Sequence, residues 1–315
     1  MFYTGTGSSL QIGKESEYGT AVTPTALIDL TSESIKVAVE KGDEGSLLAS
    51  KTPMSRDLLS ITVSGSVSFI LRPEGAGTVF LLALGGKDTV AAGEDGKHTH
   101  TMHLCEVNDN LPGATIIVDR KAKVMKYAGC TVSALSLECA AGDYVKATLD
   151  IQGVKEEAGT LNASLKSFTV PSYRCTAAVF TIGDEVYDIS SATVKIDNAL
   201  ETAPRTYSSG LYAGRPQHGR RSVTITFDIP YSEDVETLKS SFLTTEENAA
   251  VKLTFTSSDQ DHKVEISMPN VSINDVTANV GGTGILTASV SGEALSVGDT
   301  EPLEVVITDE NEEAY

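Results

Sequence analysis

The chain has 315 residues, a formal net charge of −19 and four cysteines, and 40% of its residues are hydrophobic. This length allows about two domains, and the apolar content excludes wholesale disorder. The acidic charge argues against a protein that binds nucleic acid by neutralising phosphates, since such a protein needs a basic surface.

Neither a membrane span nor a secretory signal is predicted. The longest apolar run, at 79–84, has six residues, against the roughly 20 that a spanning helix needs. The first five residues contain neither a basic nor an apolar segment, so we expect no export and no membrane partner. The cysteines form no CxxC pair, which favours reduced thiols.

Period-two alternation of apolar and polar residues is the strongest local pattern. It occurs at 61–69, 145–151 and 223–229, where Ser, Thr, Lys or Asp mostly stands between apolar residues. Successive side chains of a strand point to opposite faces, so these segments are predicted to be half-buried strands with one polar face. Turn residues at 119–121 and 257–259 indicate antiparallel hairpins.

Two short helices are also predicted. Pro73 suits a first helical turn, and the glycines at 85–86 can end the helix that begins there. Ser232 can cap a second helix, whose apolar residues at 235, 238 and 242 fall on one face. Each predicted helix follows a strand of the same type.

The order of elements repeats along the chain. Residues 147–153 match 286–292 at an offset of 139, and residues 60–63 match 222–225 at an offset of 162. The difference, 162 − 139 = 23, requires extra residues in the first half, and 87–110 is the obvious insertion.

We therefore expect two copies of one module. The first covers 1–160 and includes an N-terminal arm and the insertion. The second covers 161–315 and ends in an acidic C-terminal tail, rich in Asp and Glu over 309–313, which is expected to fray.

Two long loops join the alternating strands, at 41–57 and 200–221. The second holds the strongest basic cluster of the chain, formed by Arg205, Arg215, Arg220 and Arg221. A long loop in a compact domain is usually functional or mobile. We interpret 200–221 as an arm that docks on an acidic surface, such as another copy of the chain. A solvated loop is the alternative.

Catalytic signatures are missing, since the chain has no GxSxG, P-loop or dinucleotide-binding fingerprint. His98, His100 and His103 lie near Cys105 and are the one tempting metal cluster. Alternation along a strand directs His103 away from the other two, so a polar strand in the insertion explains them better. We expect a protein that is not an enzyme and has no metal site or cofactor.

Several stretches resemble a known family. Residues 8–21, SSLQIGKESEYGTA, resemble the opening of siphophage tail tube proteins, in which a similar GKE…YGTA run recurs. The segment from His98 through Leu111 and 127–132, YAGCTV, to Gly153 resembles the same family. The resemblance covers most of the first half of the chain. In the second half it is mainly a resemblance of pattern.

The resemblance implies a mainly β module of sandwich or barrel type with one short α-helix. Together with the internal repeat, it predicts two such tail tube modules in tandem. Strands of neighbouring subunits would form a ring with an inner β-barrel, and stacked rings would form a tube through which viral DNA passes. The simplest family pattern has one module per chain and six chains per ring. Two modules per chain therefore suggest a trimeric ring.

The same resemblance implies a place in the virion tail of a long-tailed, non-contractile phage, after assembly in the host cytoplasm. The expected partners are further copies of the chain and the tape measure, terminator and distal tail proteins. Viral DNA would be a passenger without specific binding, because the negative charge repels its phosphates.

The polar faces of the predicted strands are the candidates for the lumen wall. These residues are Thr62, Ser64, Ser66, Thr148, Asp150, Thr224, Thr226, Thr287 and Ser289. Ring stacking is expected at the four arginines of 200–221, the 41–57 loop and the N-terminal segment, because basic loops that meet an acidic body give register and contact.

Other assignments stay open at this point. They are another phage tail or baseplate component, a surface adhesin of sandwich domains, and a carbohydrate-binding module or enzyme. The missing export signal counts against the adhesin. Only 6% of residues are aromatic and there is no Trp, which counts against a sugar-stacking cleft.

Overall fold

A computed structural model of the chain describes all residues except 1, 44, 46–51, 53–54, 94–95, 203–204, 208, 234, 238, 241–247 and 279–284. Strands dominate it, so the mainly β prediction is confirmed. The strands are β1 (Ser9–Lys14), β2 (Ala26–Glu33), β3 (Lys36–Gly42), β4 (Asp57–Ile70), β5 (Gly85–Ala92), β6 (His98–Leu104), β7 (Ala114–Asp119), β8 (Val124–Ala140), β9 (Lys146–Gly153), β10 (Lys155–Ala158), β11 (Val179–Ile182), β12 (Glu185–Val186), β13 (Ser191–Asp197), β14 (Ser222–Pro230), β15 (Ala249–Thr256), β16 (Lys263–Ala278), β17 (Thr287–Ala294) and β18 (Glu304–Asp309). The helices are α1 (Pro73–Leu84), a 3-10 turn η1 (Cys175–Ala177) and helical residues at 233, 235–237 and 239–240.

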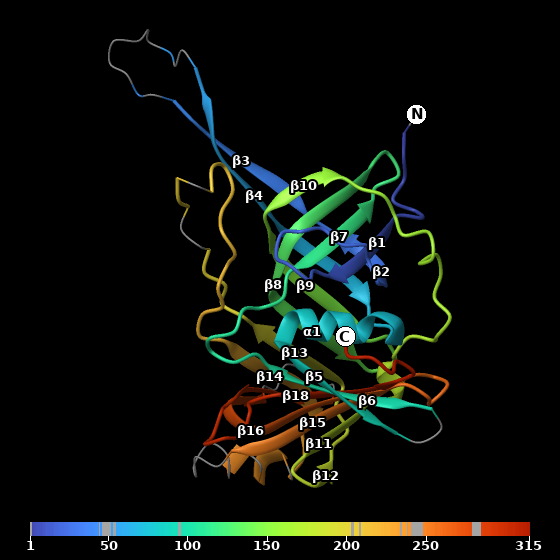
Figure 1. Cartoon of the computed structure of the whole chain (residues 1–315). Coiled ribbons are helices and arrows are strands. Elements are labelled where there is room, and N and C mark those ends of the chain that lie inside the picture. The colour runs from blue at the N-terminus through green and yellow to red at the C-terminus, as the bar shows by residue number, and fades with distance from the viewer. Residues whose placement is uncertain are drawn as a thin grey trace.

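Six strands of the first half close into an antiparallel barrel. Its order is β1–β2–β4–β9–β8–β7, and β7 pairs with β1 to complete the circle. The barrel forms the upper part of Figure 1. Because the barrel is closed, each of these six strands has a neighbour on both sides. Most of their backbone N–H and C=O groups are therefore paired.

Helix α1 lies between this barrel and the strands below it (Figure 1). It begins at Pro73 and ends at Gly85, whose φ of 74° is the left-handed conformation that ends many helices. Every residue of α1 except Glu74 is buried. Strands β1, β2, β5, β6, β8 and β18 all contact it, so no side faces water. None of the described helices is long and apolar enough to cross a membrane.

The second half contains the same succession of neighbours. The strands β14–β17–β16–β15–β11 follow one another as β4–β9–β8–β7–β1 do in the first half. Ser232 begins the second helix as predicted, since its Oγ accepts a 3.4 Å hydrogen bond from the Val235 N–H. Residues 238 and 242, predicted to share that helix's apolar face, lie outside the described residues.

The β-bulges of the two halves lie at one constant spacing. Between β7 and β8 the register shifts after Tyr127, and between β15 and β16 it shifts after Met268. A second shift follows Val132 on β8 and Ile273 on β16. Both spacings equal 141 (268 − 127 and 273 − 132), two residues more than the sequence offset of 139. Side chains of a strand return to the same face every two residues. An offset of 139 and an offset of 141 therefore match residues that lie on the same face of the sheet.

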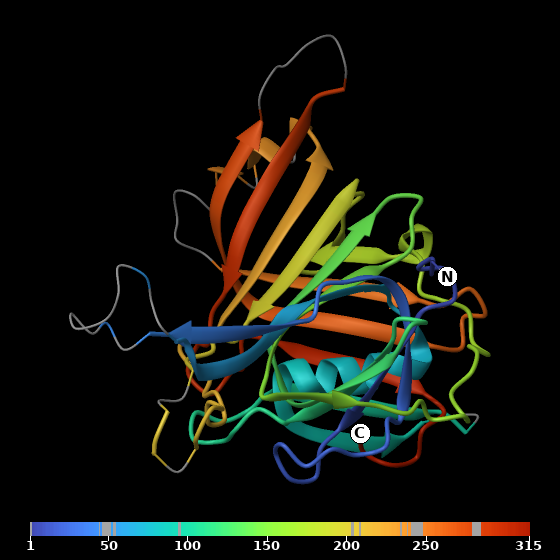
Figure 2. The same ribbon diagram turned by 90° about the horizontal axis from the view of Figure 1, so that it is seen from above.

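Pairing of β8 with β13 joins the two halves into one sheet. Its register runs from Ser191 opposite Ala140 to Asp197 opposite Ala134. The sheet then reads β3–β4–β9–β8–β13–β14–β17–β16, and its strands fan out in Figure 2 from the blue hairpin to the orange strands. The division into modules at residue 160 stays a prediction.

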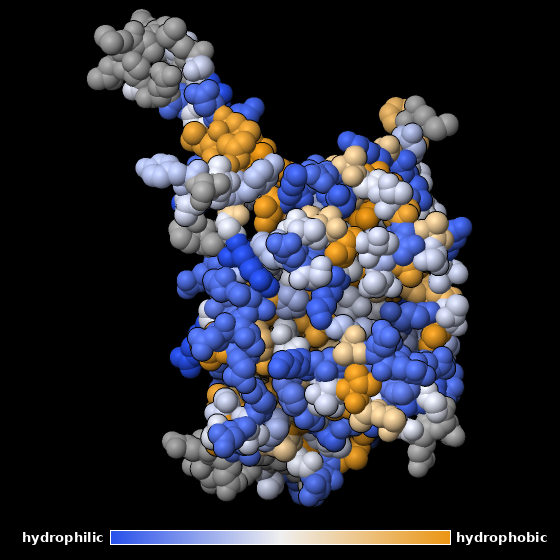
Figure 3. All heavy atoms as spheres, viewed as in Figure 1, coloured by the Kyte–Doolittle hydropathy of each residue, from blue (hydrophilic) through white to orange (hydrophobic). Residues whose placement is uncertain are grey.

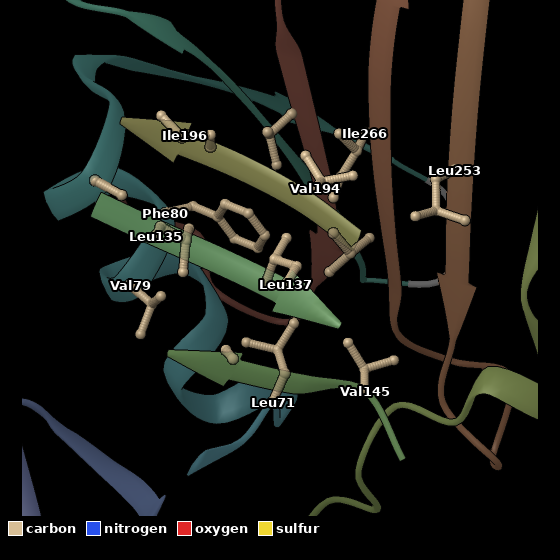
Figure 4. Packing of buried hydrophobic residues seen from close by; sticks show 14 of the residues in the cluster. Leu71, Val79, Phe80, Leu135, Leu137, Val145, Val194, Ile196, Leu253 and Ile266 are labelled. Atoms are coloured by element: carbon tan, nitrogen blue, oxygen red, sulfur yellow. The ribbon is translucent and has the colours of Figure 1, made fainter. Parts of the chain in front are cut away.

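One hydrophobic core follows this sheet across both halves. In Figure 4, Phe80 of α1 lies beside Leu135 of β8, with Ile196 of β13 and Leu253 of β15 in the same cluster. The fully buried Asn198 amide reinforces the junction, because its Nδ2 donates to the Ala83 carbonyl at 2.9 Å and to the Val132 carbonyl at 3.0 Å.

The predicted insertion at 87–110 contains most of a hairpin formed by β5 and β6. Strand β6 pairs antiparallel with β18, from His98 opposite Asp309 to His103 opposite Glu304. The insertion of the first half therefore extends the sheet of the second half, a connection that local sequence patterns do not indicate.

The expectation that the acidic tail frays is wrong. Asp309 is buried, and its Oδ1 accepts the Asn311 N–H at 2.8 Å. The tail then folds back over α1, where the Tyr315 ring lies 4.9 Å from the His100 ring and its OH donates to Asp309 Oδ2. Polar partners and the aromatic contact hold Asp309 and Tyr315 in place, whereas the carboxylates of Glu310, Glu312 and Glu313 stay exposed.

The GKE…YGTA segment has a structural role. The buried Glu15 carboxylate accepts hydrogen bonds from the Gly19 N–H at 2.7 Å, the Thr115 hydroxyl at 2.9 Å and the Gly129 N–H at 2.9 Å. The Tyr18 hydroxyl donates to the Gly129 carbonyl at 2.9 Å, and burial raises the pKa of Tyr18 to about 12. The motif thus fixes the loop after β1 against β7 and β8.

Gly77→Ala tests the docking of the tail. A Cβ at Gly77 would lie 2.0 Å from the Tyr315 ring, so we expect the free energy of unfolding to fall by about 1–3 kcal/mol, as in other overpacked cores. Thermal unfolding measures the effect. Gly5→Ala, where nothing lies within 4 Å, is the matched control.

A double-mutant cycle with Tyr315→Ala assigns the loss to this contact. In the Tyr315→Ala background the Gly77→Ala change should cost little. An equal loss in both backgrounds would contradict the docking of Tyr315 on α1.

Candidate functional site

The structure brings the nine predicted lumen residues onto one face of the joined sheet. Directly opposite residues of neighbouring strands share a face, and one row crosses the junction between the halves. It consists of Ser68, Thr148, Ser136, Lys195, Thr224 and Glu293. Alternation along each strand then assigns the remaining seven candidates to the same face as Thr148 and Thr224.

The opposite face of the same strands is buried. Val67, Leu149, Leu135, Ile196 and Ile225 each come from a different strand, and each is at most 2% exposed. From β4 to β14 the sheet therefore has one face in the core and one polar face.

Sequence reasoning missed the centre of this polar face. Strands β8 and β13 lie between the strands that carry the predicted residues. On the polar face they contribute Ser136, Glu138, Thr193 and Lys195. The signal was present, because Thr193 and Lys195 alternate with buried apolar residues as strictly as the predicted strands do.

The polar face carries more negative than positive charge. On β4, β9, β8, β13, β14 and β17 it holds the carboxylates of Glu138, Asp150, Asp197, Asp228 and Glu293 and the ammonium groups of Lys146 and Lys195. Both lysines are in ion pairs, Lys195 with Asp197 at 3.2 Å and Lys146 with Asp143 at 2.5 Å. The remaining field over the face is negative and disfavours polyanions.

The four arginines of 200–221 do not form one exposed cluster. Arg205 and Arg220 are exposed, whereas Arg215 and Arg221 are partly buried. The Arg215 guanidinium donates to the Leu111 carbonyl and lies 4.9 Å from the centre of the Tyr18 ring.

Arg221 ties the segment to the end of α1. Its guanidinium donates to the Leu84 carbonyl at 3.2 Å, to the Cys105 carbonyl and to Cys105 Sγ at 3.0 Å. Leu84 is the last residue of the helix, where carbonyls lack helical partners and attract cations.

Arg205 connects the 200–221 segment to the hairpin of β3 and β4. It donates to the Leu59 carbonyl at 3.0 Å and lies 3.5 Å from Glu40 Oε2. The pKa of Glu40 is lowered by the hydrogen bond from the Ser60 hydroxyl and then by Arg205. The two loops predicted to act in stacking are therefore neighbours, although 44, 46–51 and 53–54 of the 41–57 loop lie outside the described residues.

The same hairpin projects from the body as an arm (Figure 1) and carries an apolar patch at its base (Figure 3). Val39, Leu58 and Leu59 are 48%, 40% and 49% exposed. Exposed apolar side chains that gather on a projecting strand pair are typical of contact surfaces.

The histidines of the insertion lie on β6 and face different partners. The buried His100 ring contacts Asp88 Oδ2 at 2.7 Å and Asp309 Oδ1 at 3.2 Å, and His103 lies 3.7 Å from Glu304. Within the described part of the chain, no group of three or more His, Cys, Asp or Glu residues is placed to hold a metal ion.

Comparison with known proteins agrees with these features. The family model of phage tail tube proteins matches residues 5–294, and the search of curated proteins finds no match. The match includes the Glu15 motif, the closed barrel and all strands of the polar face. The chain therefore belongs to the phage tail tube protein family, and it is a structural component of a virion tail.

Proposed function

We propose that this protein assembles into rings that stack into a tail tube, with viral DNA passing through the lumen. The observation that carries the proposal is the single polar face that runs through both halves of the chain. One face of the sheet is committed to the core, so the other is available to line a water-filled passage.

We further propose that the chain is a duplication and that three chains form a ring with pseudo-sixfold symmetry. The equivalent strand neighbours of the two halves and the constant spacing of 141 between their bulges support this proposal. The boundary would then fall near residue 160, between β10 and β11.

The finer assignments rest on the resemblance of the first half to siphophage proteins. They are a non-contractile tail, assembly in the host cytoplasm, and the tape measure, terminator and distal tail proteins as neighbours. The role is structural, without catalysis.

Negative-stain microscopy and native mass measurement test the assembly. We expect tubes or ring stacks of the purified protein, and a ring of three chains of 33.1 kDa each. A ring of six chains would contradict the trimer, and it would place one half of each chain outside the tube wall. A protein that stays monomeric at high concentration and binds glycans would contradict the tail tube itself.

The charge of the polar face makes DNA a passenger in this proposal. Three chains carry a formal charge of 3 × −19 = −57 per ring. Carboxylates on the lumen wall would repel phosphates and leave DNA free to move.

Asp150→Lys with Glu293→Lys tests this role by adding four charge units to the polar face of each chain. We expect variant tubes to retain double-stranded DNA in a gel-shift assay at low salt and to release it as salt rises, because phosphate contacts are salt-dependent. Asp184→Lys with Glu301→Lys changes the charge equally at exposed positions away from the sheet. If both double variants retain DNA equally, the polar face is not the lumen wall.

For stacking we propose the surface formed by Arg205, Arg220 and the β3–β4 arm. Arg215 and Arg221, also predicted to act there, have contacts within the chain, so their replacement would disturb the fold as well as any interface. The exposed apolar patch could be buried against a neighbouring ring, and the arginine cations are complementary to the acidic charge of that ring.

Arg220→Glu tests stacking with the least effect on the fold. We expect rings of unchanged mass but shorter or no tubes in electron micrographs. Arg174→Glu, at another exposed arginine, controls for the change in net charge. Tubes of unchanged length in Arg220→Glu would contradict a role of this arginine.

A further inference from the structure

The joined sheet ends in two edges without a strand partner among the residues that the structure describes. Within the described part of the chain, strand β3 pairs only with β4. Strand β16 pairs with β15 up to Val271, and beyond that residue no described strand lies on the same edge, whereas the other edge pairs with β17. Such edges expose N–H and C=O groups that another strand can satisfy.

The junction inside the chain shows how an equivalent edge is filled. Strand β8 has the position of β16, and its corresponding edge pairs with β13. Two rows of residues across the sheet are equivalent, because their members on β8 and β16, and those on β9 and β17, lie 141 positions apart. They are Lys36, Ser64, Gln152 and Thr131 in the first half and Lys195, Thr224, Glu293 and Ser272 in the second. Lys36 of β3 therefore takes the place of Lys195 of β13.

The residues of the two strands agree with this equivalence. Ile35-Lys36-Val37 corresponds to Val194-Lys195-Ile196, with apolar side chains on both sides of a lysine. Lys195 lies opposite Ser136 of β8, and the residue 141 positions further on, Thr277 of β16, has no strand partner on that side within the described chain.

We propose that β3 of one copy pairs antiparallel with β16 of a second copy, in the register Lys36 opposite Thr277, Val37 opposite Val276 and Ala38 opposite Asp275. This inference deepens the proposed ring and rests on it. The pairing repeats the β8–β13 junction between chains, so the eight-stranded sheets of successive copies form one continuous wall with the polar face on one side.

Backbone directions fit the pairing. The Ser34 N–H donates to the Ser66 carbonyl at 2.9 Å, so alternation directs the N–H and C=O of Val37 away from β4. At the internal junction the Asn198 N–H donates to the Ser133 carbonyl at 2.9 Å, and Ile196, the equivalent of Val37, therefore also points its N–H across the junction.

An ion pair limits how far the new ladder can extend. Arg120 donates to Glu33 at 2.8 Å and to the Ile35 carbonyl at 2.6 Å, and the Ile35 N–H donates to Glu33 at 2.9 Å. The edge groups of Ile35 are thus already satisfied. A partner strand begins at Lys36, which excludes registers that slide toward β2.

Disulfide trapping tests the register. Lys36→Cys with Thr277→Cys introduces two exposed thiols, while the four native cysteines are buried. In the proposed register they form a non-hydrogen-bonded pair, about 4.5 Å apart between Cα atoms, which a disulfide can bridge. Oxidation of assembled protein should give a reducible ladder on gels that ends at the number of chains per ring, with three expected.

Two matched variants calibrate the result. Lys195→Cys with Ser136→Cys places the same pair at the internal junction, so it should cross-link within one chain and give no ladder. Lys36→Cys with Ser272→Cys also has both cysteines on the polar face. Residue 272 lies five residues from 277, about 15 Å along β16, so this variant should give no ladder. If wild-type protein forms rings and the 36–277 pair cross-links no more than the 36–272 pair, the register is wrong.

Val37→Pro tests the pairing without cysteines. Proline removes the N–H that points toward the second copy, and an edge strand tolerates this loss. We expect an unchanged unfolding midpoint and loss of rings, whereas Ala38→Pro removes an N–H directed at β4 and should lower the midpoint. Normal rings in folded Val37→Pro would overturn the proposal. If wild-type protein forms no rings under any condition, the proposed function fails and this pairing fails with it.

Discussion

The ladder between β8 and β13 is the interaction on which the rest of the structure depends. Strand β8 is 17 residues long, and its first part closes the barrel while its second part carries the next half of the chain. The ladder makes one sheet out of two sets of strands. Without it, the polar face would be two separate surfaces and α1 would lose one wall of its environment.

The faces of this sheet divide the chemistry of the protein. Apolar residues from both halves pack on one side with α1, and burial of this kind is the main stabilising contribution in a domain of this size. The other side holds Ser, Thr and an excess of carboxylates, which suits a wall that must be wet and must not bind DNA. This face holds only a small share of the 43 acidic residues of the chain, so most of the acidic charge lies elsewhere on the molecule.

The basic segment at 200–221 shows that local charge alone does not define an interface. Arg221 satisfies carbonyls at the end of α1, and Arg215 stacks on Tyr18 and binds a loop carbonyl. Arg215 and Arg221 therefore hold the chain together. Arg205 is exposed but also binds the Leu59 carbonyl, and Arg220 is exposed. The acidic tail is a parallel case, since Asp309 contacts His100 and Tyr315 contacts Asp88.

Local sequence patterns predict the alternating strands, the helix between Pro73 and Gly85, the cap at Ser232 and the polar residues that share a face within each strand. These features depend on periodicity and on side chains close in sequence, which one segment displays alone. Long-range contacts in the fold are what pair β7 with β1, β6 with β18 and β8 with β13, bring the nine polar residues onto one face and set which arginines are exposed. Those outcomes depend on strand pairs and hydrogen bonds between residues about 50 to 200 positions apart, and any half-buried alternating strand offers the same backbone donors and acceptors to every other one.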